Sequence, residues 1–284
     1  MSTAERDYVL GTHDAEIERL GLQHRVWRAR VLDGWKRAGF GPGARLLDLG
    51  CGPGWASLDM ADVAGPSGQV HAIDRSRRFL DHLRARAARV EAPTAGAATA
   101  AARAPIETYE RDLDEDALPD LQVDGAFARW VFAFVKRPQA LLERVARVIR
   151  PGGVLVHHEY VDYATWRLTP RSEAFEEFVR AVMRTWRAGG GEPDIGLDLP
   201  RWLEETGFTV RDLRVYIDVV RPDDPIWAWP RSFVEVGIQR LIDLGAFEPA
   251  RADEVLRAVA AAEKTPGARC VTPALVEIQA VRRD

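Results

Sequence analysis

Three glycines at alternate positions, Gly50, Gly52 and Gly54, mark the stretch of this 284-residue chain best suited to hold a ligand. The apolar run before them, residues 46–49, is typical of a buried parallel strand, and good helix formers follow from residue 55. Because glycine has no Cβ, the turn can adopt positive φ and a ligand can touch the backbone. A strand, a glycine turn and a helix in this order predict a nucleotide-cofactor site.

The residue at the start of that helix argues against a dinucleotide. The NAD and FAD fingerprint requires a third glycine three residues after the second. Trp55 occupies that position, and its indole would push the helix away from the strand. A nicotinamide-dependent oxidoreductase is therefore disfavoured, although it stays open as an alternative.

A carboxylate follows at the distance that a ribose needs. A second strand, residues 69–74, ends in Asp74, roughly 20 residues after the glycine turn. A carboxylate placed there can accept hydrogen bonds from both hydroxyls of a ribose. The structural alternative is an N-cap for the next helix, and the two roles are compatible.

Residues 48–54, Asp-Leu-Gly-Cys-Gly-Pro-Gly, resemble the first motif of the class I S-adenosylmethionine (SAM) methyltransferases. Residues 123–129 resemble the Phe-Asp-x-x-x-x-Arg segment of that family. Residues 149–155 resemble its Leu/Ile-x-Pro-Gly-Gly-x-Leu turn, which is structural. The matching segments follow the family's order and extend over nearly the whole chain.

The resemblance implies an α/β, Rossmann-like fold with a seven-stranded, mostly parallel sheet, helices on both faces and an antiparallel last strand. Residues 1–40 are expected to form an N-terminal helical lid, and residues 41–160 the SAM-binding core. Residues 161–284 are expected to form a helical substrate cap, interleaved with the last two strands at 210–220 and 271–281. Large aromatic residues in this cap favour an apolar acceptor pocket, although such residues more often pack in a core.

The resemblance also implies roles for individual residues at the cofactor. Asp112 is expected to accept from the adenine amino group, with Asp114 as the alternative. Arg75 stands where the family often has an apolar residue, and its flat guanidinium could stack on the adenine. The predicted cofactor-binding residues are Tyr8 and Gln23 at the methionine end, Asp48 beneath the loop, and Gly50, Cys51, Gly52, Asp74, Arg75, Asp112, Leu113 and Arg129.

Two polar residues follow the fourth and fifth strands, where α/β sheets bind ligands. Arg129 is expected to flank the sulfonium and the substrate, and a buried ion pair is its structural alternative. His158 shares one strand face with Tyr160, opposite His157 and Glu159. Because histidine titrates near neutrality, His158 is the candidate general base, with simple packing as the alternative. No paired ligand clusters occur, so no metal is predicted.

The composition and charge of the chain limit the kinds of partner that the protein could bind. The formal net charge is −4, and no basic domain is evident, which argues against nucleic acid. The segment after the fourth strand also lacks the Asn/Asp-Pro-Pro-Tyr/Phe pattern of adenine-N6 methyltransferases. The chain opens with polar residues and contains no apolar run of membrane-spanning length, so a cytoplasmic protein is expected.

The sequence thus predicts a bacterial SAM-dependent methyltransferase that acts on a small molecule, with O- or N-methylation favoured over C-methylation. The helical inserts could carry a homodimer interface. One alternative is a SAM-binding enzyme that does not methylate, such as a cyclase or a decarboxylase on the same scaffold.

Overall fold

A computed structural model describes residues 12–91 and 102–284. Seven strands form one sheet in the order β3-β2-β1-β4-β5-β10-β7. The pairs from β3 to β5 are parallel, whereas β10 is antiparallel to both of its neighbours. The predicted Rossmann-like sheet is therefore confirmed. Its strands are β1 (Arg45–Leu49), β2 (Gln69–Asp74), β3 (Ile106–Glu110), β4 (Val123–Arg129), β5 (Ile149–Asp162), β7 (Phe208–Tyr216) and β10 (Ala274–Arg282).

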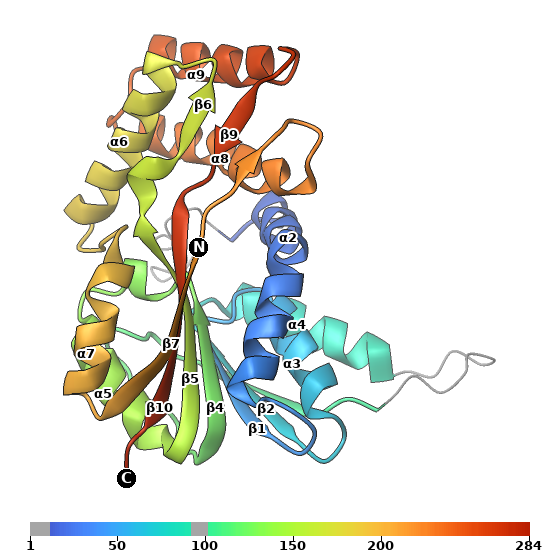
Figure 1. Cartoon of the computed structure of the whole chain (residues 1–284). Helices are drawn as coiled ribbons and strands as arrows, with labels where there is room; N and C mark the ends of the chain where they lie inside the picture. Colours follow the sequence, from blue (N-terminus) through green and yellow to red (C-terminus); the bar gives the residue numbers. More distant parts are fainter. Residues whose placement is uncertain (1–11, 92–101) are drawn as a thin grey trace.

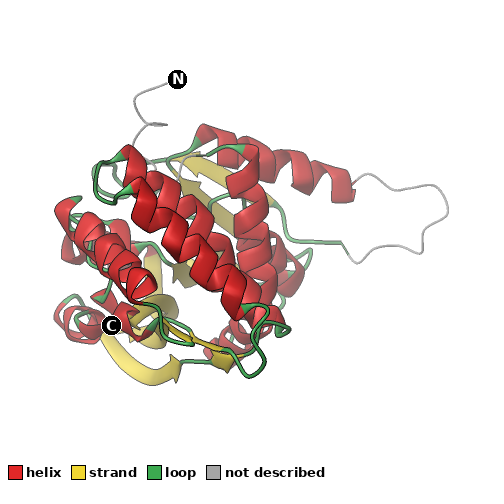
Figure 2. Cartoon of the chain, turned by 90° about the horizontal axis from the view of Figure 1, so that it is seen from above, coloured by secondary structure: helices red, strands yellow, loops and turns green. Residues whose placement is uncertain are grey.

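Helices cover both faces of this sheet (Figures 1 and 2). α2, α3 and α4 pack on one face, and α5 and α7 pack on the other. β1 carries leucines on both of its faces, because Leu46 faces the first layer while Leu47 and Leu49 face the second. The helix bounds are α2 (Asp14–Ala38), α3 (Trp55–Ala64), α4 (Arg77–Glu91), α5 (Pro138–Val148) and α7 (Leu199–Glu205).

Two insertions before and after β7 build a cap above the carboxyl ends of the strands (Figure 1). The cap contains helices α6 (Glu173–Ala188), α8 (Ala228–Asp243) and α9 (Pro249–Ala262). It also contains a small sheet in the order β6-β9-β8, with strands β6 (Arg167–Thr169), β8 (Val219–Val220) and β9 (Arg269–Val271). The expectation of an all-helical cap was therefore incomplete.

The small sheet also changes the last two predicted strands. Residues 210–220 do not form one strand, because β7 ends at Tyr216 and β8 pairs with β9 in the cap. The segment 271–281 is likewise divided between β9 and β10. Each division lies where the chain passes between the main sheet and the cap.

The N-terminal helix α2 is a single helix of 25 residues that ends at Gly39 in the left-handed conformation. It lies against α8 of the cap, β5 of the sheet and α3. α2 is thus positioned between the cap and the glycine turn. Within the described residues, no helix has the length and apolar character that crossing a membrane would require.

Candidate active site

The glycine turn between β1 and α3 leaves room for a ligand at one position. Gly50, Gly52 and Gly54 all have positive φ. A Cβ on Gly50 would lie 2.6 Å from Val131, and one on Gly54 would lie 2.4 Å from Leu83. Among the described residues, a Cβ on Gly52 would meet only Leu20 of α2, at 4.0 Å. Gly50 and Gly54 are required by close packing, whereas a Cβ on Gly52, although that residue is buried, would have no described atom beyond its chain neighbours closer than Leu20, so a ligand can contact the backbone there.

Asp74 lies beside Gly52, as a ribose site requires. Its Oδ2 accepts a hydrogen bond from the Gly52 N–H, and its Oδ1 accepts one from the Ser76 N–H, both at 2.8 Å. The second bond makes Asp74 part of the cap of α4, as the structural alternative predicted. Burial raises the pKa of Asp74, and the two N–H groups oppose the rise. Each carboxylate oxygen still has a lone pair that can accept from a ligand hydroxyl.

Asp48 and Cys51 fix the turn from beneath. The Ser57 hydroxyl donates to Asp48 at 2.6 Å, which joins the end of β1 to the first turn of α3. The Cys51 N–H donates to the Ile73 carbonyl at 2.9 Å and so attaches the turn to β2. Burial raises the pKa of Asp48 to about 7. It also raises the pKa of the Cys51 thiol, which is therefore not activated as a nucleophile.

Trp55 begins α3 without displacing it from the sheet, because its indole points toward α2 and α4. A Cβ on Gly21 of α2 would lie 2.8 Å from this indole. The Arg86 guanidinium lies 3.9 Å from the ring centroid. Gly21 thus provides the space that the indole needs, and the expected displacement of the helix was wrong.

The predicted adenine residues come together at the ends of β2 and β3. Arg75 Nη1 lies 3.9 Å from Asp112 Oδ2. Asp112 Oδ1 accepts from the Asp114 N–H at 2.8 Å, and its side chain remains partly exposed. Asp114 Oδ1 instead accepts from the Lys136 N–H at 2.8 Å, next to α5. Of the two aspartates, Asp112 is the one beside Arg75. Leu113 is buried next to it.

Arg129, at the end of β4, lies under α2. Its Nη2 lies 3.1 Å from Nδ1 of His24, and its guanidinium lies 5.2 Å from the Trp130 ring centroid. Burial lowers the pKa of Arg129 to about 10, although the charge of Asp48 opposes this. Among the described residues Arg129 has no ion-pair partner within 4 Å, so the buried-pair alternative is not what the structure contains.

His158 is held by a carboxylate from the neighbouring strand. Its Nε2 lies 3.0 Å from Oε2 of Glu277 on β10, and its Nδ1 is buried with no hydrogen bond to any described residue. Glu277 also pairs with Arg37 of α2 at 2.7 Å. Despite its burial, hydrogen bonds from His158 and other donors lower the pKa of Glu277 to about 2. Glu277 is thus ionised, and His158 donates its Nε2–H to it.

The residues on the opposite face of β5 support the loop after β4. Glu159 Oε1 accepts from the N–H groups of Val131 and Phe132, both at 2.8 Å. His157 lies with its ring centroid 4.7 Å from that of Phe132, and neither ring nitrogen has a hydrogen-bond partner within residues 12–91 and 102–284. The predicted division of these side chains between the two faces is therefore confirmed.

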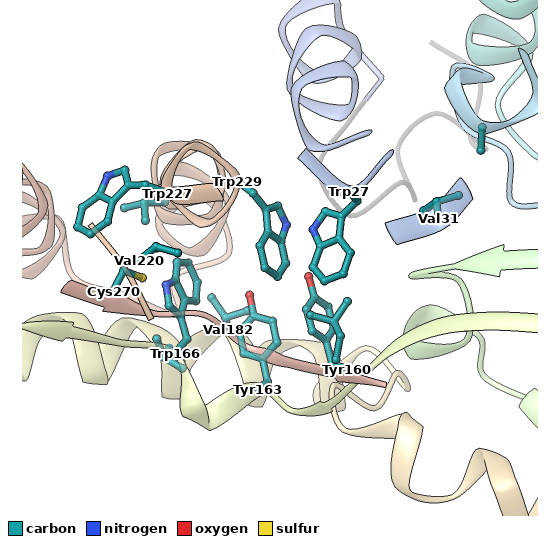
Figure 3. Packing of buried hydrophobic residues seen from close by; sticks show 14 of the residues in the cluster. Trp27, Val31, Tyr160, Tyr163, Trp166, Val182, Val220, Trp227, Trp229 and Cys270 are labelled. Atoms are coloured by element: carbon teal, nitrogen blue, oxygen red, sulfur yellow. The ribbon is translucent and has the colours of Figure 1, made fainter. Parts of the chain in front are cut away.

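Aromatic rings form the wall beside this site. The Trp130 ring lies between Tyr160 and Trp229, at centroid distances of 5.8 and 5.7 Å and interplanar angles of 26° and 20°. Figure 3 shows Tyr160 and Tyr163 with their hydroxyls directed toward Trp27 and Trp229. This wall combines rings from β5, α8 and α2 with the ring that follows β4.

Trp130 is held in an unusual backbone conformation. Its φ is +52°, in the left-handed region that bulky residues rarely adopt. The Trp130 N–H donates to the His158 carbonyl at 2.9 Å, which fixes the turn out of β4. The indole is thereby positioned over the end of the sheet, close to Arg129.

Of the two cofactor-binding residues predicted in the lid, one lies in the described part of the chain. Gln23 is buried, and its Oε1 accepts from Arg19 Nη1 at 3.0 Å. Arg19 pairs with Glu16 one turn earlier, at 2.7 Å. Tyr8 lies outside the described residues. Nowhere in the described ranges do three histidine, cysteine, aspartate or glutamate side chains gather as a metal ion would require.

The sequence reasoning did not single out His24, Asp59 or Glu277. His24 and Asp59 bridge α2 and α3 next to Arg129, with Nε2 and Oδ2 separated by 3.0 Å. The spacing of His24 and Arg28 on one helix face was a signal, because both reach Asp59. Glu277, a charged residue within an apolar alternating strand, was another such signal.

The described residues fit SAM at the ribose and at the methionine end. Asp74 retains acceptor capacity next to the open position at Gly52. Arg129 Nη1 is buried with no acceptor in the described part of the chain, as expected of a donor that binds an anionic group of a ligand.

Comparisons with known proteins agree with the fold that carries these residues. Residues 47–157 match a family model described as a methyltransferase domain. A protein of unknown role in a transposon of Streptomyces fradiae is 31% identical over 60% of this chain and 44% of its own length. Demethylmenaquinone methyltransferase of Staphylococcus aureus is 28% identical over 47% of this chain and 49% of its own length. The chain thus spans less than half the length of these relatives.

Solved structures share the fold. A methyltransferase candidate from Bacillus halodurans has a TM-score of 0.57 and 17% identity, covering 90% of this chain and 100% of its own. The [4+2]-cyclase SpnF has a TM-score of 0.52 and 20% identity, covering 89% of this chain and 81% of its own. Residues 47–157 thus match a methyltransferase domain in sequence, and the order of the strands agrees with the fold of these solved structures.

Proposed function

We propose that this protein transfers a methyl group from SAM to an oxygen or nitrogen of a small molecule with a flat apolar part. The observation that carries the proposal is the position of the aromatic wall, directly beside the cofactor site. Trp130 follows the strand that ends in Arg129, and its ring lies between Tyr160 and Trp229. A flat acceptor would find stacking partners there, next to the reactive end of the cofactor.

The chain's own residues would hold the cofactor by its three parts. Asp74 and the Gly52 backbone would bind the ribose, while Asp112 and Arg75 would bind the adenine. Arg129, with Gln23 nearby on α2, would bind the methionine end. When bound, SAM supplies an activated methyl group on a sulfonium. The protein would then align the acceptor and exclude water from the site.

The proposal keeps His158 as general base for a hydroxyl acceptor. Its Nε2–H donates to ionised Glu277, which leaves the Nδ1 lone pair free to accept a proton. Burial lowers the pKa of His158, while the hydrogen bond that its ring donates to Glu277 opposes this, so the ring is neutral at pH 7. Its exposed fraction of 1% requires that the acceptor reach it through movement of the covering Trp27.

Both relatives named above come from bacteria, which supports a bacterial setting, and the Staphylococcus aureus relative supports a small-molecule acceptor. The name of the Staphylococcus aureus relative gives demethylmenaquinone as its acceptor, which has the flat ring that the aromatic wall would suit. We also propose that the protein acts in a bacterial cytoplasm, with a small molecule and not nucleic acid as its partner.

A two-step experiment tests the proposal. Thermal shift with SAM, S-adenosylhomocysteine, NADH and NADPH should show stabilisation by the first two only. Candidate ring hydroxyls and amines are then screened with SAM for formation of S-adenosylhomocysteine. Stabilisation by the nicotinamides alone would overturn the cofactor assignment.

SpnF supports a second candidate, a SAM-binding enzyme that does not methylate, because a cyclase shares this fold. Tight binding of SAM without S-adenosylhomocysteine formation across the acceptor panel would favour that candidate. Formation of S-adenosylhomocysteine with any acceptor would exclude it.

A further inference from the structure

Arg129 is a partly buried cation whose charge is not neutralised by direct contact within the described residues. Its Nη2 lies 3.1 Å from the ring nitrogen of His24, and its Nη1 is buried with no hydrogen-bond partner among the described residues. The rings of Trp130 and Phe127 lie 5.2 and 6.0 Å from the guanidinium. Such contacts offset only part of the cost of removing a charge from water. An anion at Nη1 would supply the missing interaction.

The hydrogen bonds around His24 have a fixed direction. A guanidinium can only donate, so His24 Nδ1 must be the acceptor of the bond from Arg129. The ring proton therefore resides on Nε2, which donates to Asp59 Oδ2 at 3.0 Å. Burial lowers the pKa of His24 although Asp59 opposes this, and a neutral ring is what the arrangement requires.

Asp59 is itself oriented by a second arginine. Arg28 donates to its two oxygens, from Nε at 2.7 Å and from Nη2 at 3.1 Å. Burial works in the opposite direction, yet the hydrogen bonds from His24 and Arg28 lower the pKa of Asp59. Arg28, Asp59, His24 and Arg129 thus form one connected series, which we call the Arg28–Arg129 series. It joins α2, α3 and the end of β4.

We propose that Arg129 is the anchor of a carboxylate-binding site for the methionine end of the cofactor, and that His24 and Asp59 are positioning residues that direct its Nη1 toward that carboxylate. The proposal rests on the proposed function. It deepens that function because it assigns the recognition of one chemical group, the α-carboxylate, to residues on three different elements. Because helix α2 contributes a residue to this site, docking of α2 and binding of the cofactor carboxylate would be coupled.

The probe is a pair of ligands that differ in one group. S-adenosylhomocysteine carries the carboxylate, and 5′-deoxy-5′-(3-aminopropylthio)adenosine lacks it but retains the amine, the thioether and the adenosine. Calorimetry on the full chain should give at least about ten-fold tighter binding of S-adenosylhomocysteine, the ratio that a charge-assisted hydrogen bond supplies. Arg129→Met should bring the two affinities close to each other.

Variants of His24 test whether this residue positions Arg129 or contributes only to packing. His24→Phe keeps the ring bulk but removes both hydrogen bonds, and it should reduce the preference for S-adenosylhomocysteine several-fold. His24→Gln retains an acceptor and a donor and should restore much of that preference. His71, another buried histidine, is the control. His71→Phe should lower the melting temperature at most, with the affinity ratio unchanged.

The outcomes distinguish this proposal from the one on which it rests. If the wild type binds neither ligand, the cofactor assignment fails and the carboxylate site fails with it. If it binds both equally, the cofactor assignment stands and the carboxylate site is wrong. If the ratio falls in Arg129→Met but not in His24→Phe, Arg129 binds the carboxylate and the positioning role of His24 is overturned.

Discussion

The carboxylate of Asp74 both shapes its site and can bind a ligand. Its oxygens accept from the N–H groups of Gly52 and Ser76, which sets the distance between the glycine turn and α4. The lone pairs that remain lie beside the open position at Gly52. A substitution at Asp74 should therefore lower both the stability of the fold and the affinity for a ligand, and the two effects can be measured independently.

Asp74→Asn should raise the dissociation constant of S-adenosylhomocysteine at least about ten-fold, because a neutral amide loses the charge-assisted bonds to the ribose. Isothermal calorimetry measures the constant, and thermal unfolding reports the lost cap. Asp62→Asn, at an exposed pair with Arg103, is the matched control and should change neither. An unchanged constant in Asp74→Asn would mean that the ribose is held elsewhere.

His158→Ala tests the predicted base. With a hydroxyl acceptor, kcat should fall about 10²–10⁴-fold, the usual contribution of general base catalysis, while the affinity for S-adenosylhomocysteine stays within a few-fold. Steady-state kinetics beside calorimetry separates the two effects. Full turnover in the variant would leave His158 with a purely structural role in the pair with Glu277.

His157 gives a pH prediction with a definite sign. Burial lowers its pKa to about 3 in the folded chain, against roughly 6.5 unfolded. The unfolded chain therefore takes up a proton that the folded chain does not as the pH falls below 6.5. Stability falls with it.

Urea unfolding at pH 7 and pH 5 measures this effect. His157→Phe should lose about 2 kcal/mol less between these pH values than the wild type. His13→Ser, at the exposed N-cap of α2, should behave as the wild type does. Equal losses in all three proteins would show that His157 titrates normally.

At the scale of elements, ion pairs attach the second half of α2 to β10 and to the segment after β7. Arg37 near its end pairs with Glu277 of β10 at 2.7 Å, and Arg30 pairs with Asp218 after β7 at 2.8 Å. Glu277 has no exposed surface on its side chain, so loss of its charge leaves Arg37 and His158 without their partner.

Glu277→Ala should lower the free energy of unfolding by about 3–5 kcal/mol, the range for breaking a buried ion pair. Denaturant unfolding measures it. Glu204→Ala is the control, because its pair with Arg283 is exposed and should contribute at most about 1 kcal/mol. A loss below 1 kcal/mol in Glu277→Ala would show that the buried pair is replaceable by packing.

The sequence predicted the core elements because each carries a strong local signal. Gly50 and Gly52 break an apolar run, and Asp74 ends the next one. The cap strands β6, β8 and β9 carry no such signal, since two or three residues are too few to show alternation. Their pairing depends on tertiary contacts with one another.

The same limit applies to the site. Asp74, Asp112 and Arg129 follow predicted strands and could be placed from the motif. His24 could not be placed, because its partners Asp59 and Arg129 lie 35 and 105 residues away. Only the packing of α2 on α3 and β4 brings these three together.

At the scale of the whole molecule, one apolar surface has no cover among the described residues. Leu213, Val215, Ile217 and Val219 alternate along β7 and into β8, with exposed fractions from 48% to 66%. β7 is also an edge strand, and such edges readily pair with another chain. The predicted homodimer would use this surface more readily than the helical inserts.

Light scattering after size exclusion should therefore give the mass of a dimer, and Val215→Lys should shift it toward the monomer. Leu256→Lys, on α9 of the cap, is the control and should leave the dimer intact. A monomeric wild type would overturn the homodimer. If only Leu256→Lys were monomeric, the interface would lie on the helical inserts and not on β7.

The antiparallel β10 has a consequence for how the protein folds. β10 follows both cap insertions in the chain but lies between β5 and β7 in the sheet. Until it arrives, β5 presents an open edge, and Arg37 lacks Glu277. Contacts this distant in sequence form slowly, and open strand edges invite association. During synthesis, α2 can form its ion pair with Glu277 only after the ribosome has added β10. We therefore expect the proposed cofactor site to be among the last parts of the nascent chain to fold.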